Sequence, residues 1–412
     1  MPPKEPIEYE WIDGVECLGL YEPGGYHPVM IDALLHGRYR VVDKSGFGGY
    51  STIWLAHDVQ LQRYVAVKVN ISGPSLPRRE PAILRALSAA DATPTPSTVH
   101  TAAIEACDAI PCILDEFEIR GPNGTHACYA VAPAQGNLRE ASFSRLFPID
   151  VARALAAKLA VAVLFVHSQG IVHGDIHLRN VLVKLPSSLD DLSVDQFRHK
   201  FGEPETAPIR RVDGKPLSPN VPTHAVMPLY LGEKAQDFTL DDARGLILGD
   251  FGEAFAPATE RRLGKHCNTP VAKRAPETLF EPDAPVSYPS DVWGLGLAMW
   301  EILGMKALFG ESETRDEVVA QQIDVLGSRG FPPAWAREWD GPPHGGKEGT
   351  PRRPATDDRE TWPPLDEAFE EFVQKYRRRR GTAGSLERRK RRRFSAWCGH
   401  ARVPARGPPD DT

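Results

Sequence analysis

Residues 173–180 read His-Gly-Asp-Ile-His-Leu-Arg-Asn and residues 250–252 read Asp-Phe-Gly, and these two stretches decide the fold. The first follows residues 148–168, where apolar side chains recur at steps of three or four, as on the buried side of a helix. It is followed directly by Val181-Leu182-Val183, an apolar run with the length of a strand. The second comes one residue after Leu246-Ile247-Leu248, a similar run. The pattern predicts that Asp175 and Asn180 lie in a loop between a buried helix and a strand. It also predicts that Asp250 lies just after the end of a second strand.

Further upstream, a glycine-rich loop stands between two expected strands. Residues 45–51 read Ser-Gly-Phe-Gly-Gly-Tyr-Ser, and the apolar runs at 39–42 and 51–56 on either side predict a hairpin. Glycine lets the backbone come close to a phosphate group that a side chain would keep away. Side chains alternate along the next strand, residues 64–69, so Ala66 and Lys68 share one face. The candidate nucleotide-binding residues are Gly46, Phe47, Gly48, Gly49, Ser51, Ala66 and Lys68.

Together these residues supply the parts of a phosphoryl-transfer site. Lys68 is expected to neutralise two phosphates of a bound nucleotide. Asp175 is expected to accept or orient the proton of the attacking hydroxyl, and Asn180 and Asp250 are expected to bind Mg²⁺, which prefers oxygen ligands. Glu80, on the helix that follows Lys68, is the expected ion-pair partner of that lysine, although a glutamate at a helix start also serves as a capping charge.

Composition and charge restrict the class of protein. The chain has 412 residues, 41% hydrophobic and 25% charged, which is ordinary for a soluble globular protein. Its six cysteines show no Cys-x-x-Cys spacing, so we interpret them as reduced thiols without a zinc site. The start lacks the pattern of a secretory signal, and no apolar run approaches the ~20 residues of a membrane helix, which predicts a cytoplasmic or nuclear protein without a membrane partner.

The net charge of −6 hides an asymmetry along the chain. Residues 373–412 hold 13 Lys+Arg and 3 Asp+Glu, a balance of +10, which leaves −16 for residues 1–372. An acidic body suits a basic partner, because opposite fields steer encounter, but the same charge also serves solubility alone.

These motifs make the chain resemble the eukaryotic protein kinases and, among them, the SR-protein kinases, which phosphorylate serine in arginine–serine-rich splicing factors. The resemblance is carried by Gly-Gly-Tyr-His-Pro-Val at 24–29, the glycine loop and strand at 46–55, Gly-Pro-Asn-Gly-Thr-His-Ala-Cys at 121–128, and a long segment between residue 180 and Asp250. It spans roughly residues 9–335 and is close to a divergent fungal branch that shares the His-Gly-Asp-x-His form.

The resemblance implies ATP and Mg²⁺ as cofactors and a protein substrate that is basic and rich in arginine and serine. It also implies a monomer that makes no direct contact with nucleic acid. Residues 132–135 would form the hinge that reads adenine through its backbone, which adds Ala132 and Ala134 to the nucleotide-binding residues. The acidic stretch 311–317 is either a docking site for a basic substrate or a solvated loop.

The implied fold class is α+β with two lobes. A small, β-rich N-lobe with one main helix is expected over residues 37–135, after an N-terminal extension over 1–36. A larger, mostly helical C-lobe is expected over 136–376, with a proline-rich insertion at about 186–239, because the strands on either side would otherwise be joined by a short connection. Residues 377–412 are arginine-rich with almost no apolar content, and predict a disordered or aberrant tail, or alternatively a nuclear-import signal.

Two residues depart from the family's pattern. Residue 174 is glycine where many kinases carry the arginine that meets an activation-loop phosphate, which predicts activity without phosphorylation of that loop. Residue 177 is histidine where protein kinases usually carry a lysine near the transferred phosphate. We count His177 with Asp175, Lys68 and Glu80 as the candidate catalytic residues, although a largely neutral histidine offsets less charge.

Two alternatives to a protein kinase remain open at this point. A catalytically weak or inactive pseudokinase scaffold is favoured by His177 and by the atypical C-terminus. A small-molecule phosphotransferase of the aminoglycoside or choline type shares the motif His-Gly-Asp-x-His-x-x-Asn. Ala-Pro-Glu at 275–277 argues against the second alternative, because it matches the close of a protein kinase's activation segment.

Overall fold

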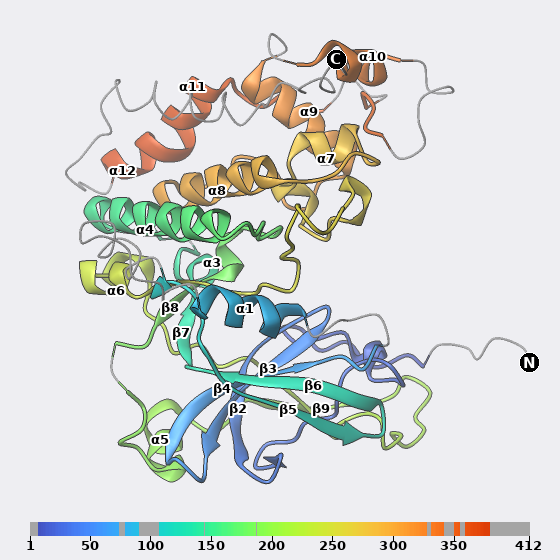
Figure 1. The fold of residues 1–412 in the computed structure, drawn as a ribbon, viewed down its shortest axis with the longest axis vertical. Coiled ribbons are helices and arrows are strands. Elements are labelled where there is room, and N and C mark those ends of the chain that lie inside the picture. The colour runs from blue at the N-terminus through green and yellow to red at the C-terminus, as the bar shows by residue number, and fades with distance from the viewer. Residues whose placement is uncertain are drawn as a thin grey trace, which may run out of the picture. The chain divides into compact units, whose positions relative to one another are not determined.

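The computed structural model describes residues 7–73, 79–89, 107–143, 145–186, 188–327, 331–341, 350–354 and 359–379. These residues form two compact units, both drawn in Figure 1. The smaller unit takes its residues from 1–92, 110–136 and 183–233, and the larger unit from 93–109, 137–182 and 234–412. The smaller unit is rich in strands and the larger is mostly helical, so the expected α+β class with two lobes is confirmed.

The smaller unit is built on an antiparallel sheet of six strands in the order β1-β2-β3-β4-β6-β5 (Figure 1). The strands are β1 (Leu34–Leu35), β2 (Tyr39–Gly48), β3 (Ser51–Asp58), β4 (Arg63–Asn70), β5 (Ile113–Gly121) and β6 (Gly124–Val131). The expected hairpin around the glycine loop is β2–β3, with Gly48 opposite Ser51. Strand β7 (Ala134–Asn137) follows this sheet along the chain.

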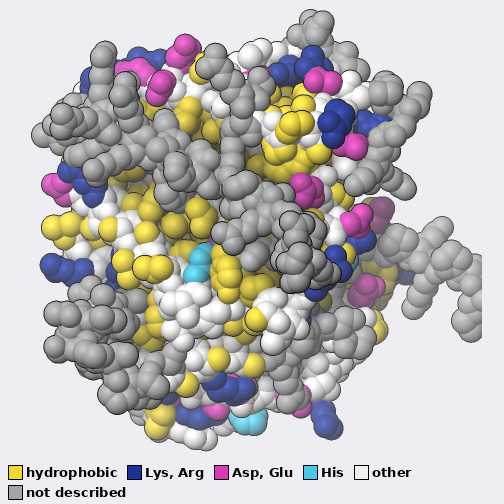
Figure 2. All heavy atoms as spheres, turned by 45° about the horizontal axis from the view of Figure 1, so that its top comes forward, with side chains coloured by type: hydrophobic (Ala, Val, Ile, Leu, Met, Phe, Trp, Pro, Cys, Tyr) yellow, Lys and Arg dark blue, Asp and Glu magenta, His cyan; other side chains and the backbone are white. Residues whose placement is uncertain are grey.

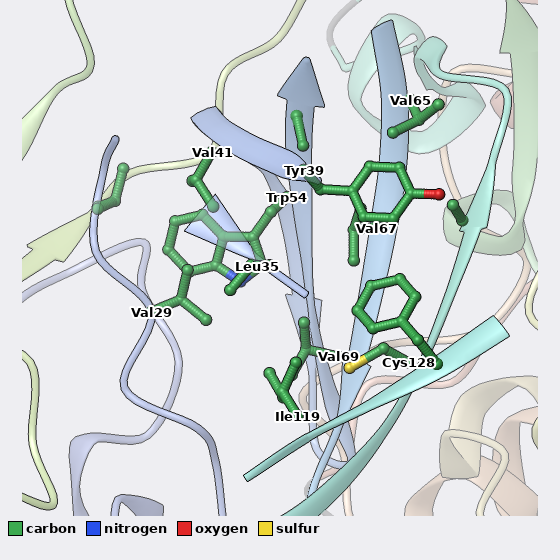
Figure 3. Packing of buried hydrophobic residues seen from close by; sticks show 14 residues of the cluster. Val29, Leu35, Tyr39, Val41, Trp54, Val65, Val67, Val69, Ile119 and Cys128 are labelled. Carbon is green, nitrogen blue, oxygen red and sulfur yellow. The ribbon is translucent and has the colours of Figure 1, made fainter. Parts of the chain in front are cut away.

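Side-chain alternation along β4 places the core of this unit on one face of the sheet. Val65, Val67 and Val69 are almost fully buried and point into one cluster with Tyr39 and Trp54 (Figure 3). Because neighbouring side chains of a strand point to opposite faces, Lys68 is left on the other face. The alternation predicted from the sequence is therefore confirmed. On this unit, α1 (Arg79–Ala89) buries Leu84 and Leu87.

The N-terminal extension and the insertion share a hydrophobic cluster within the smaller unit. Residues 9–26 and 209–225 contribute apolar side chains to it, and the backbone amide of Glu10 donates to the carbonyl oxygen of Arg210 at 2.9 Å. The extension also contains a 3-10 turn, Leu18–Leu20. The sequence predicted that the insertion belongs to the larger lobe. The structure differs, because residues 183–233 pack with the smaller unit.

The insertion has short elements of its own: α5 (Val194–Phe201), β9 (Thr206–Pro208) and β10 (His224–Val226), with β9 and β10 paired. Ser193 begins α5 with a capping box that involves Gln196. Phe197 is fully buried and packs with Tyr64 of β4 at a ring-centroid distance of 5.4 Å. An apolar helix face thus fixes the insertion on the sheet.

The larger unit is organised around two buried helices, α4 (Ile149–Ser168) and α8 (Tyr288–Leu303) (Figure 1). Both have apolar side chains on most sides, as expected for helices enclosed by others. Apart from short 3-10 turns, the other elements among the described residues are α3 (Leu138–Ala141), β8 (Val181–Lys184, which leads out of the unit), α6 (Leu240–Arg244), β11 (Leu246–Leu248), α7 (Pro276–Phe280), α9 (Arg315–Leu326), α10 (Pro333–Trp339), α11 (Leu365–Phe369), the π-helical turn Glu370–Gln374 and α12 (Lys375–Arg379).

The sequence placed the start of the tail at residue 377, and the structure corrects this boundary. Arg377 lies in α12 with only 1% of its surface exposed. Its guanidinium donates to the carbonyl oxygens of Leu303 at 2.8 Å and Phe147 at 3.2 Å. The π-helical turn before it buries Phe372 and Val373. The arginine-rich run therefore begins inside the fold, and residues 380–412 lie outside the described residues.

None of the helices in the described part of the chain combines the length and the apolar character that a membrane-spanning helix needs.

Candidate active site

The candidate site residues divide between the two units. The larger unit contains Asp175, His177, Asn180 and Asp250. The smaller unit contains the glycine loop, Lys68 and Glu80.

The loop before Asp175 is held by His173, which is fully buried. The amide of Asp175 donates to Nδ1 of His173 at 3.3 Å, so Nε2 carries the proton and donates to the carbonyl oxygen of Gly249 at 3.1 Å. Phe251 packs edge-on against the imidazole at 4.7 Å between ring centroids. The residues on both sides of Asp250 thus contact the histidine that supports Asp175.

A buried carboxylate fixes the same loop from the helix side. Asp291 of α8 accepts the amides of His173 at 2.7 Å and Gly174 at 2.8 Å. It also contacts Nε2 of His167 at 2.9 Å. Asp291 and His167 are therefore structural residues here.

Gly174 has a physical reason for departing from the expected arginine. Its φ of +81° lies in the left-handed region, and an added Cβ would come within 2.8 Å of the carbonyl oxygen of Glu253. Its own carbonyl oxygen accepts the hydroxyl of Thr269 at 2.7 Å. Thr269 is buried, and this hydrogen bond joins it to the loop that contains Asp175. This arrangement agrees with a loop ordered without a phosphate on residue 269.

Asp175 has two carboxylate oxygens in different surroundings. Oδ2 receives Nδ2 of Asn180 at 3.1 Å and lies 3.3 Å from Nε2 of His177. Oδ1 is buried and has no hydrogen-bond partner within the described structure. A buried carboxylate oxygen without a donor is costly unless a ligand supplies one. This oxygen is therefore well suited to accept a proton from a bound hydroxyl group.

Asn180 is buried at the end of a 3-10 turn, Leu178–Asn180. Its Nδ2 donates to the main-chain oxygen of Asp175 at 2.9 Å as well as to Oδ2. Because both donor contacts involve nitrogen, the amide oxygen Oδ1 remains the group that can ligate a cation.

Asp250 is exposed and has a φ of +58°. Aspartate is one of the few residues that visit the left-handed region, and such backbone strain concentrates at functional positions. Its Oδ1 accepts the amide of Gly252 at 3.4 Å. Residue 250 lies two residues after β11 ends at Leu248, close behind this strand as the sequence predicted.

In the smaller unit, Lys68 and Glu80 form the predicted ion pair. Nζ of Lys68 lies 2.8 Å from Oε2 of Glu80, and both residues are less than 9% exposed. The pair joins β4 to the first turn of α1. A capping charge alone would not need this contact, so the ion-pair interpretation of Glu80 is confirmed.

The glycine loop leaves open space where side chains would stand. A Cβ added at Gly46, Gly48 or Gly49 would meet no atom within 4 Å, and none of the three has a positive φ. Neither packing nor backbone conformation therefore requires glycine at these positions. Close approach of a ligand to the backbone is the physical reason that remains.

The other predicted nucleotide-binding residues are all located in the smaller unit. Phe47 is 39% exposed at the loop, and Ser51 and Ala66 are buried in β3 and β4. Ala132 is exposed after β6, and Ala134 begins β7.

Glu277 has a half-buried carboxylate, and burial raises its pKa to about 7. Among the described residues no ion pair with Glu277 occurs.

The acidic stretch 311–317 is partly engaged within the protein. Glu311 pairs with Arg139 at 2.7 Å and with Lys273 at 3.2 Å. Glu317 accepts the hydroxyl of Thr314 at 2.7 Å as a helix cap. The ion pairs of Glu311 explain this residue without a docked substrate.

Sequence reasoning missed Tyr26, whose hydroxyl donates to the carbonyl oxygen of Gly48 at 2.7 Å. It also missed the contact of Thr269 with Gly174. A tyrosine inside a turn-rich extension gives no periodic signal, so nothing in the local pattern indicated that Tyr26 reaches the glycine loop.

The donor set fits Mg²⁺ and a nucleotide. The amide oxygen of Asn180 and the carboxylate of Asp250 are the hard oxygen ligands that Mg²⁺ prefers. In the smaller unit, an ammonium held by a glutamate and a loop of open glycines suit phosphate groups. Asn180 and Asp250 would therefore hold the metal, and Lys68 the phosphates.

Comparison with known proteins gives relatives of one kind. No family model matches the chain. A serine/threonine protein kinase of Aspergillus fumigatus is 26% identical over 351 residues, which cover 79% of this chain and 76% of that protein. Protein kinase dsk1 of Schizosaccharomyces pombe is 34% identical over 171 residues, 40% of this chain and 30% of dsk1.

Human SRSF protein kinase 3 is 30% identical over 168 residues, which cover 40% of this chain and 28% of that protein. Among solved structures, a crystallised kinase domain matches with a TM-score of 0.49 and 20% identity, covering 73% of this chain and 74% of that one. The curated relatives from Aspergillus fumigatus, Schizosaccharomyces pombe and human are all named protein kinases, so the chain is a homologue of the serine/threonine protein kinases and resembles the SR-protein kinases among them.

Proposed function

We propose that the protein is an ATP-dependent kinase that phosphorylates serines in basic, arginine- and serine-rich protein segments. The observation that carries the proposal is the pair of unlike oxygens on Asp175. One oxygen is held by Asn180 and His177, and the other is buried without a donor among the described residues. A fixed carboxylate with one unused oxygen is what a hydroxyl nucleophile requires.

Bound magnesium–ATP supplies the phosphoryl group. Asp175 orients the substrate hydroxyl and takes up its proton through Oδ1, while Asn180 keeps the carboxylate in place through Oδ2. Lys68, held by Glu80, offsets the charge of the phosphates, because a charge-assisted contact positions the ammonium before the ligand arrives. Positioning and electrostatics supply most of the catalysis in this class of reaction.

The preference for a basic substrate is supported by charge and by the names of the relatives. Residues 1–372 carry a net charge of −16, and SRSF protein kinase 3 is among the similar proteins. On the described surface visible in Figure 2, acidic and basic side chains are interspersed and form no continuous patch of one sign. We therefore base the substrate class on overall field and homology and not on one docking surface.

A non-catalytic scaffold is the second candidate, favoured by one contact. His177 is 9% exposed and its Nε2 lies 3.3 Å from Oδ2 of Asp175, where a lysine is expected in an active kinase. The lysine ammonium expected here would be a fixed positive charge beside the transferred phosphate, and its absence lowers the stabilisation of that phosphate.

The test is transfer of the labelled γ-phosphate of ATP to peptides that differ only in their basic residue. We expect transfer to an Arg-Ser repeat, weaker transfer to Lys-Ser, and none to Ala-Ser or to choline and an aminoglycoside. Asp250→Ala is expected to abolish transfer, whereas Asp366→Ala, an exposed acid in the first turn of α11, should not change it.

Each outcome separates the candidates. Transfer that persists in Asp250→Ala would come from a contaminating kinase. Absence of transfer together with ATP-dependent thermal stabilisation would favour the scaffold. Transfer to choline or the aminoglycoside, but not to peptides, would overturn the proposal in favour of a small-molecule phosphotransferase.

We extend the proposal to a monomer in the cytoplasm or nucleus, with residues 380–412 acting as a basic import signal. A fluorescent fusion that ends at residue 379 retains Arg377 and its helix. It should lose nuclear signal relative to the full chain, and equal distributions would contradict an import role.

A further inference from the structure

The glycine loop (residues 45–51) is joined to the N-terminal extension by the hydrogen bond from Tyr26 to Gly48. Tyr26 is 2% exposed, and its hydroxyl donates to the main-chain oxygen of Gly48 at 2.7 Å. Gly48 ends β2 in an exposed loop, and its neighbours Phe47 and Tyr50 are 39% and 51% exposed. A buried donor thus reaches the most exposed part of the hairpin.

The ring of Tyr26 is fixed by its own surroundings. Its amide donates to the carbonyl oxygen of Leu20 at 2.9 Å, and its carbonyl oxygen accepts Nδ2 of Asn123 at 2.6 Å. The ring packs against Tyr21 at 5.5 Å in the cluster shared with the insertion. Burial raises the pKa of the Tyr26 hydroxyl to about 12, so it remains a donor at neutral pH.

A second attachment holds β2 four residues before Gly48. The ammonium of Lys44 is fully buried against the carboxylate of Glu16, which also accepts the hydroxyl of Tyr21. The backbone oxygen of Lys44 accepts the amide of Leu229 from the insertion at 2.7 Å. The strand that leads into the loop is therefore anchored by the extension and by the insertion.

A buried tyrosine hydroxyl needs some acceptor, and satisfying it is the simplest role for this bond. Here, however, the acceptor is the main chain of the glycine loop itself. A Cβ added at Gly46, Gly48 or Gly49 would meet no atom within 4 Å, so packing at these positions adds little to the restraint that the pairing of β2 with β3 provides. A bond from a rigid base to Gly48 adds a further restraint, which reduces the conformational freedom that the loop would lose when a ligand binds.

We propose that Tyr26 is a positioning residue for the nucleotide phosphates, which holds the Gly48 peptide in one orientation before ATP binds. The inference rests on the proposed ATP-dependent function. Loosening the loop reduces the fraction of molecules in the binding-competent state, and the apparent affinity falls by that fraction.

Tyr26→Phe removes the hydroxyl and keeps the ring. We expect the KM for ATP to rise about threefold to tenfold, as for loss of one hydrogen bond, with kcat and the KM for peptide changed little. Without nucleotide, amide hydrogen exchange across residues 45–52 should accelerate by a similar factor.

Tyr39→Phe is the matched control. The Tyr39 hydroxyl donates to Oδ2 of Asp115 at 2.6 Å in the same unit, and it does not contact the glycine loop. This variant should lose comparable thermal stability and leave the KM for ATP and the exchange of residues 45–52 unchanged.

Loop exchange in Tyr26→Phe equal to wild type, or a KM for ATP that stays the same or falls, would overturn the inference. An equal rise of KM in both variants would also overturn it, because the effect would then be general loosening of the unit. Failure of the proposed function has a different signature. In that case the wild-type protein neither transfers phosphate nor is stabilised by ATP, but amide exchange in the loop still accelerates in Tyr26→Phe. This result would keep Tyr26 as a restraint on the loop and would refute ATP as the ligand of the loop.

Discussion

Loss of the charge on Glu16 is expected to destabilise the smaller unit strongly. Lys44 is fully buried in β2, and Glu16 of the extension is 4% exposed. Their contact is the ion pair that compensates the buried ammonium, with Phe47 and Trp54 providing ring faces at 5.2 and 5.4 Å. Burial lowers the pKa of Lys44, whereas Glu16 opposes this shift.

The expected magnitude follows from removal of one partner of a buried pair, which costs about 3–5 kcal/mol. For a unit of this size, each kcal/mol lowers the melting temperature by roughly 2–4 °C, so Glu16→Gln should lower it by roughly 6–20 °C. Partial compensation by the glutamine oxygen and by the two aromatic rings favours the lower half of this range.

The loss of stability in Glu16→Gln should depend on pH, because the substitution changes the pKa of Lys44. Without Glu16, the folded-state pKa of Lys44 falls further below that of the unfolded chain. At pH values between these two pKa values the unfolded state binds more protons than the folded state, so the free energy of unfolding of Glu16→Gln rises with pH. We expect its deficit relative to wild type to be smaller at pH 9 than at pH 6.

Urea unfolding at the two pH values measures both quantities. Glu10→Gln, an exposed acid of the same extension, is the control and should stay within about 0.5 kcal/mol of wild type. The double variant Glu16→Leu/Lys44→Met should regain most of the loss, because apolar residues can replace a buried pair. A loss in Glu16→Gln below about 1 kcal/mol, or one independent of pH, would refute the buried pair as the anchor of the extension.

Three further predictions concern the larger unit. Asp175→Asn should lower kcat about 10²–10⁴-fold in the peptide assay with unchanged thermal stability, and an active variant would show that Asp175 is not the proton acceptor. Arg377→Met leaves the carbonyl oxygens of Leu303 and Phe147 without their donor, so urea unfolding should show a loss of about 2–4 kcal/mol; a neutral result would place Arg377 outside the fold. Glu277 has a folded-state pKa of about 7, above the ordinary 4.5, so the wild-type protein loses stability as pH rises through this window. Glu277→Gln should therefore gain about 1–2 kcal/mol relative to wild type at pH 8 compared with pH 5, a value reduced for partial exposure, and no gain would indicate a cationic partner for Glu277.

The parts of the site that depend on local periodicity could be predicted from the sequence. Alternation along residues 64–69 placed Lys68 opposite the valine core, and the order of strand and helix gave Glu80 as its partner. Asp175 and Asn180 share one short loop, so their contact needs only local geometry. In each case the residues that interact lie close in sequence or on adjacent elements.

The parts that depend on distant packing could not be predicted. Composition classed Arg377 with a disordered tail, because a count of charges does not distinguish one buried guanidinium from its solvated neighbours. Gly174 was recognised as a departure, but its cause is a left-handed backbone against Glu253, from another loop of the chain. Neither the burial nor the loop contact produces a repeat in the sequence.

The boundary of the smaller unit is also set by contacts between segments that are distant in the sequence. A segment cut at residue 37 would remove Glu16 and Tyr26, leaving a buried ammonium in β2 and an unrestrained Gly48. A segment without the insertion would expose Tyr64 of β4, which packs against Phe197, and remove the amide that Leu229 donates to Lys44. The sheet over residues 37–135 therefore does not contain all the contacts that stabilise it. The extension and the insertion both contact β2, the strand that leads into the glycine loop, so we expect a change in either segment to alter the conformation of that loop.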